Sequence, residues 1–75
     1  MKKEIPAIVE IFRTDITDPV RADICALVLS RHFPHAGIDF DLEDTDHILR
    51  IEDSDIDPEG IISVLKSMGI TGDLL

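Results

Sequence analysis

The side chains that could bind a metal ion are one cysteine, three histidines and many carboxylates. His32 and His35 are three residues apart, and neutral imidazoles at that spacing can share a zinc or nickel ion. Pro34 lies between them and should break a helix, so a shared geometry is not assured. Cys25 has no second cysteine beside it and is expected to be a small buried apolar residue. We expect no metal site and no cofactor; the candidate ligands, if a metal binds, are Asp15, Asp18, Cys25, His32, His35 and His47.

Acidic residues dominate the segment from Asp39 to Glu59, which holds ten acids and one base. The spacing of three aspartates in "DSDID" resembles the first ligands of a calcium loop, but the sixth and twelfth positions of such a loop are Pro58 and Val64 where glycine and glutamate are needed. The acids therefore predict a solvated surface, with a basic protein partner as the alternative. The residues expected to form this surface are Asp39, Asp41, Arg50 and Glu52.

Catalysis finds little support in the sequence. Ser30, Ser54 and Ser67 have no histidine and aspartate at a recognisable spacing, and no glycine-rich phosphate loop occurs. We therefore expect a protein that is not an enzyme.

The elements that must position these side chains follow from alternating hydrophobic periods. Residues 7–13 predict a strand, and Asp18 and Pro19 predict the start of a helix that runs to about Phe33. Residues 37–44 and 48–53 predict an antiparallel hairpin. Asp57 and Pro58 predict a second helix that ends at Gly69, and residues 70–75 predict a last edge strand. The order is βαββαβ, which predicts an α+β, ferredoxin-like sandwich in which two helices cover one face of an antiparallel four-stranded sheet. We expect a single domain over residues 1–75, ordered from about 7 to 74.

The first predicted helix has apolar residues on two arcs. The arc expected to face the core contains Val20, Ile24, Leu27 and Val28. The second arc contains Ala22, Cys25, Ala26, Leu29 and Phe33. A helix on a sheet needs only one apolar arc, so we expect the second to pack partly on the other helix and partly on another chain. Leu29 and Phe33 are the interaction residues expected there, and a homodimer is one alternative.

The charge composition of the chain disfavours some classes of binding partner. The chain of 75 residues carries 16 acids against 7 lysines and arginines, a net charge of −9, which disfavours nucleic acid and anionic membranes. The start "MKKEIPAIVEIF" has no continuous apolar stretch and predicts no signal peptide, and no apolar run approaches the roughly 20 residues of a membrane span. A single cysteine favours a cytoplasmic protein.

The segment "GIDFDLEDTDHILRIEDSDIDPEGIISVLKSMGITGDLL" resembles the second half of a heavy-metal-associated domain, the family of small copper chaperones and of modules in metal-transporting ATPases. The resemblance implies the ferredoxin-like fold and covers roughly residues 8–74. In that family a Met-x-Cys-x-x-Cys loop between the first strand and helix binds the metal; here the loop is "TDITDPV", without cysteine, and Ile70 replaces the family's aromatic residue near the loop. The resemblance therefore implies the fold without copper binding. We expect a non-catalytic interaction module; the alternatives are a metal-binding protein that uses His, Asp or Cys25 ligands, and a small-molecule-sensing regulatory domain of the same topology.

Overall fold

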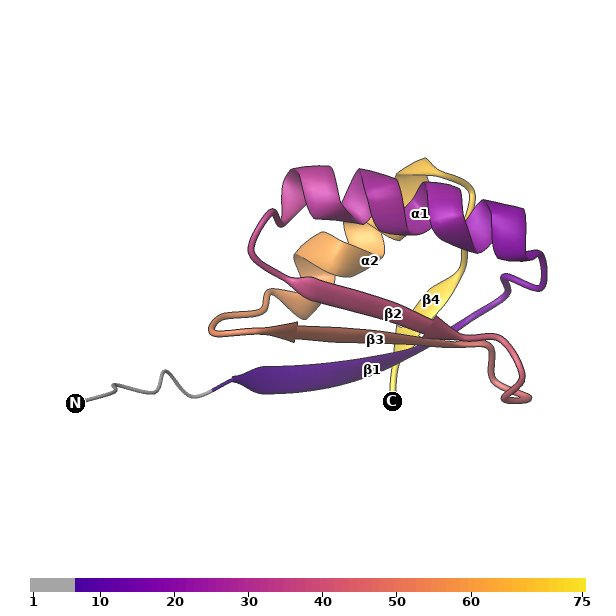
Figure 1. Cartoon of the computed structure of the whole chain (residues 1–75), viewed down its shortest axis with the longest axis horizontal. Helices are drawn as coiled ribbons and strands as arrows, with labels where there is room; N and C mark the ends of the chain where they lie inside the picture. Colours follow the sequence, from indigo (N-terminus) through magenta and orange to yellow (C-terminus); the bar gives the residue numbers. More distant parts are fainter. Residues whose placement is uncertain (1–6) are drawn as a thin grey trace.

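The computed structural model describes residues 7–75. The protein consists of a four-stranded antiparallel sheet with both helices on one face (Figure 1). The elements in chain order are β1 (Ile8–Thr14), α1 (Pro19–His32), β2 (Gly37–Asp41), β3 (Ile48–Asp53), α2 (Pro58–Ser67) and β4 (Gly72–Leu74). The strand order in the sheet is β2-β3-β1-β4. The predicted βαββαβ, ferredoxin-like fold is confirmed. Lys2 and Lys3, which entered the interpretation of the start of the chain, lie outside the described residues.

The register of the sheet sorts its side chains onto two faces. Phe12 lies opposite Leu49, and Ile11 lies opposite Arg50. Because side chains alternate along a strand, Phe12, Leu49 and Ile51 point together toward the helices, and all three are buried. Arg50 and Glu52 point to the other side of the sheet and are exposed, as predicted.

The ends of the helices follow the predicted signals with one exception. The Asp18 carboxylate accepts a hydrogen bond from Val20 N at 3.0 Å and caps α1. Asp57 occupies the equivalent position before α2, but its side chain makes no capping hydrogen bond. Gly69 has φ of +75° after the last turn of α2, and Ile70 N donates to Leu65 O at 2.9 Å, the Schellman arrangement that ends a helix.

The first hairpin strand is shorter than predicted. β2 ends at Asp41 rather than continuing to residue 44. The Asp41 and Asp44 carboxylates accept hydrogen bonds from Glu43 N and Asp46 N, so these aspartates bend the chain locally instead of extending the ladder.

The orientation predicted for α1 is wrong. Ala22, Cys25 and Leu29 are its buried residues. Val20, Ile24 and Leu27, which were expected in the core, are 62%, 55% and 61% exposed. The small side chains of Ala22 and Cys25 let α1 lie close to the sheet, and this favours the arc that carries them.

The interaction role predicted for Leu29 depended on that orientation and is therefore wrong. Leu29 is fully buried, so it is a core residue and cannot contact a partner. Phe33 is half-buried and packs against the same core, which leaves only part of its side chain accessible.

Candidate functional site

The β1–α1 loop, residues 15–18, carries Asp15 and Asp18, two of the side chains considered above as metal ligands. Thr14 anchors the start of this loop: its Oγ1 donates to His47 O at 2.6 Å and accepts from Ile16 N at 3.3 Å. The Asp15 carboxylate accepts from Thr71 N at 3.1 Å. Hydrogen bonds therefore tie the loop to the β2–β3 turn on one side and to the segment after α2 on the other.

An apolar side chain fills the space under this loop. Ile16 is fully buried, and Ile70 is 5% exposed. Both belong to the hydrophobic core. Of the two loop carboxylates predicted as metal ligands, Asp15 bonds to Thr71 N and Asp18 caps α1. The loop is thus part of the core packing and offers no thiolate for a soft metal ion.

Cys25 lies on the buried face of α1 and is fully covered. Burial raises the pKa of its thiol from 9.0 to about 11, and the nearby Arg21 guanidinium opposes this only in part. The thiol is therefore protonated at neutral pH, and a metal ion would have to displace that proton. The prediction that Cys25 is a small buried residue is confirmed.

The three histidines do not converge. His32 and His35 are exposed at the α1–β2 end of the molecule. His47 lies at the opposite end of β2, in the β2–β3 turn, with φ of +48° (Figure 1). Its Nδ1 atom is buried without a hydrogen-bond partner among the described residues. Within residues 7–75, no three side chains of His, Cys, Asp or Glu lie together in a way that could hold a metal ion.

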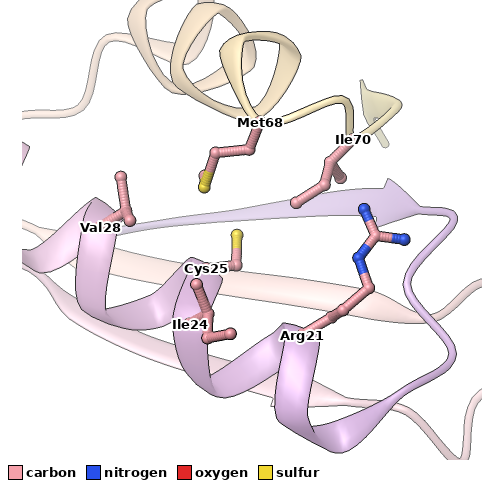
Figure 2. A pocket seen from close by; sticks show the side chains of 6 residues that line it. All are labelled: Arg21, Ile24, Cys25, Val28, Met68 and Ile70. Carbon is pink, nitrogen blue, oxygen red and sulfur yellow. The ribbon is translucent and has the colours of Figure 1, made fainter.

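A hollow of about 330 Å³ lies between residues 21–28 of α1 and residues 68–70, which directly follow α2. Figure 2 shows Met68 and Ile70 facing α1 across this space, with the sulfur atoms of Cys25 and Met68 turned toward it. One charged group, Arg21, lies at its edge. The residues that line this α1–α2 hollow are Arg21, Ile24, Cys25, Val28, Met68 and Ile70. No local sequence signal predicts this hollow, because Met68 and Ile70 meet α1 only through the tertiary fold.

The face of the sheet away from the helices, here called the open sheet face, carries the predicted acidic residues. Asp39 lies opposite Arg50, and Arg50 Nη1 is 3.9 Å from Glu52 Oε1. The four predicted interaction residues Asp39, Asp41, Arg50 and Glu52 are all exposed there.

An apolar strip occupies the middle of the open sheet face. Val9 and Ile11 of β1 lie opposite Glu52 and Arg50, and Ile48 lies opposite Arg13. Val9 is 40% exposed. These residues were not among the predicted surface residues. The available signal was that β1 has apolar residues on both sides, of which only the Phe12 side is needed for the core.

Comparisons with known proteins show the class of fold to which this chain belongs, through solved structures and not through related sequences. No protein-family model matches the chain, and no curated protein sequence matches it. The fold does match solved structures and is that of a small α+β, ferredoxin-like domain. One is described as a gold binding protein: the TM-score is 0.77 at 15% identity, and the match covers 88% of this chain and 98% of that one. Another is the intact alpha subunit of aIF2 from Pyrococcus abyssi, with a TM-score of 0.54 at 20% identity; the match covers 96% of this chain and 34% of that one.

Neither helix among residues 7–75 has the length and apolar character needed to cross a membrane.

Proposed function

We propose that this protein is a small non-catalytic interaction module of heavy-metal-associated-like fold that lacks the thiolate metal site. The observation that carries the proposal is the closed β1–α1 loop, in which Ile16 fills the core and Asp15 bonds to Thr71 N. Where the resembling family presents two thiolates to a metal ion, this chain presents an apolar side chain and a bonded carboxylate.

The partner that fits the open sheet face is a basic protein with apolar side chains. The face combines an apolar strip of Val9, Ile11 and Ile48 with a charged border, in which the acids Asp39, Asp41 and Glu52 outnumber the bases Arg13 and Arg50. Such a mixture suits a protein interface. Burial of the apolar centre stabilises the complex, and the charged rim selects the partner and steers its approach. A cytoplasmic location forms part of this proposal, since the single cysteine is a free thiol.

Soft-metal binding is the competing function. Two observations favour testing it: a gold binding protein shares the fold, and the sulfur atoms of Cys25 and Met68 face one hollow (Figure 2). The raised pKa of the Cys25 thiol weakens it, because two pKa units lower the thiolate fraction at neutral pH by about 100-fold.

The test is a titration of the protein with Cu(I), Au(I), Zn²⁺, Ni²⁺ and Ca²⁺, followed by native mass spectrometry. We expect no stoichiometric complex with a dissociation constant below about 10 μM, a free energy of binding of about −7 kcal/mol. Stoichiometric binding that disappears in Cys25→Ser or His47→Ala would overturn the proposal and make the protein a metal carrier with unusual ligands.

A second experiment tests the surface. A lysine-rich amphipathic peptide serves as the probe, and amide chemical shifts report where it binds. We expect shifts on β2 and β3, and weaker binding by the double variant Asp39→Asn/Asp41→Asn. The matched control is Glu43→Gln/Asp44→Asn, which removes the same charge from the β2–β3 turn; equal weakening by both variants would mean that net charge, and not the open sheet face, attracts the probe.

A further inference from the structure

The outer face of α1 is an apolar ridge that the fold leaves uncovered. Val20, Ile24 and Leu27 are 62%, 55% and 61% exposed. They follow one another at intervals of four and three residues, and this spacing places them in one line along a helix, opposite the buried Ala22, Cys25 and Leu29. The same spacing is typical of the seam by which two helices pack together.

The α1–α2 hollow lies directly beside this ridge. Ile24 belongs to both, since it projects from α1 and also lines the hollow with Val28 and Met68 (Figure 2). One surface thus holds a projection and a depression of the same apolar character. A twofold dimer requires such a self-complementary surface, because each copy must supply both halves of every contact.

Two copies of this acidic chain repel each other overall, so charge decides on which surface they can meet. The segment 37–57 carries nine acids and one base, so two copies repel each other wherever these segments approach. α1 carries Arg21 and Arg31 against Asp23, a surplus of one positive charge on a chain of net charge −9. The outer face of α1 is therefore the apolar surface on which two copies meet with the least repulsion, and Asp23 of one copy can pair with an arginine of the other.

We propose that the protein forms a twofold homodimer in which the ridge of Val20, Ile24 and Leu27 packs against the same ridge of a second copy, with Leu27 of each copy directed to the α1–α2 hollow of the other. This dimer does not depend on the function proposed for the open sheet face, which remains free on both copies. The ridge on α1 is short, because a helix of 14 residues is about 21 Å long. The interface is therefore small, and we expect a weak dimer.

Sedimentation equilibrium between about 10 μM and 1 mM tests the proposal, because a weak dimer with a dissociation constant in this range is resolved there. We expect the average mass to rise from 8.4 kDa toward twice that value. Added salt should strengthen the dimer, since it screens the repulsion between two acidic chains while the apolar contact persists. A mass of 8.4 kDa throughout, at low and high salt, would show that another occupant or only water covers the ridge, and would overturn the proposal.

Two substitutions separate the ridge from the net charge. Leu27→Glu and Leu27→Lys change the charge in opposite directions, yet each places a charge in the apolar seam of both copies. We expect each to weaken the dimer at least about 100-fold. Leu75→Glu is the matched control, because Leu75 is 55% exposed at the edge of the sheet and the substitution adds the same charge as Leu27→Glu.

The monomer should tolerate all three substitutions, since these side chains are exposed, and circular dichroism verifies that the fold is kept. A dimer that survives both Leu27 variants, or one that weakens as salt is added, would assign the association to another surface. Nuclear Overhauser contacts between labelled and unlabelled copies, from Leu27 methyl groups to Met68, are the direct sign of the proposed packing.

Discussion

Substitution of Ile16 by alanine tests whether the β1–α1 loop is part of the core. Ile16 is fully buried, so the variant loses three buried carbon atoms, worth about 2.4 kcal/mol of transfer free energy at about 0.8 kcal/mol each. The cavity left behind raises the expected loss to about 3 or 4 kcal/mol. A chain of 75 residues has a free energy of unfolding of roughly 4 to 11 kcal/mol, so Ile16→Ala should remove about a quarter of it or more.

Urea unfolding followed by circular dichroism is the appropriate assay, because the protein has no tryptophan and no tyrosine for fluorescence. With a slope of about 1 kcal/mol per molar urea, the midpoint should fall by about 3 M. Ile16→Val, with an expected loss of about 1 kcal/mol, keeps the test decisive if the alanine variant is unfolded in buffer. The control is Thr17→Ala in the same loop, where the side chain is exposed and the effect should stay within about 0.5 kcal/mol. If the Ile16 and Thr17 variants lose the same stability, the loop is not packed into the core and the argument against a ligand loop fails.

Three further predictions concern stability. Burial raises the pKa of the Cys25 thiol from 9.0 to about 11, so between these pH values the folded state keeps a proton that the unfolded chain releases. The free energy of unfolding should therefore fall by about 2 kcal/mol between pH 9 and pH 11, and this fall should be absent from urea titrations of Cys25→Ala. Gly72→Ala would place its Cβ atom 2.5 Å from the buried Leu65 side chain of α2 and should lower the free energy of unfolding by about 1 to 3 kcal/mol. Gly37→Ala meets only ordinary contacts, so its effect should stay within about 0.5 kcal/mol. Equal melting temperatures for the two variants would contradict the close packing of β4. Asp18→Ala removes the hydrogen bond that caps α1 and should cost about 1 kcal/mol, while Asp57→Ala, whose side chain makes no such bond, should cost less than half as much in the same urea titration; the reverse order would be inconsistent with the observed caps.

The element order could be predicted because its signals are local. An aspartate before a proline starts both helices, and Gly69 ends the second one in a left-handed conformation that suits glycine. Alternation along β3 correctly separated Ile51 from Glu52. Each of these features depends on a few neighbouring residues and not on the rest of the fold.

The orientation of α1 could not be predicted in the same way. Apolar residues occur on both arcs of this helix, so the periodic pattern does not distinguish the arc of Ile24 from the arc of Cys25. The spacing of Val20, Ile24, Leu27 and Val28 predicts that their arc faces the core, but close packing on the sheet favours the smaller Ala22 and Cys25. The α1–α2 hollow was missed for a related reason, since it depends on the distance between two helices that are far apart in sequence.

The position of β1 in the sheet has a consequence for how the protein folds. β1 is the first strand of the described chain, yet it lies inside the sheet, between β3 and β4. During synthesis β1 has no partner until β3 has left the ribosome, and it gains its second partner only with β4, because both strands follow it in the chain. Loop closure over such long separations slows folding, and until it is complete both edges of β1 can pair with other unfinished chains. Folding should therefore be a single late event, and a fragment that stops before Gly72 should aggregate rather than form a smaller stable sheet.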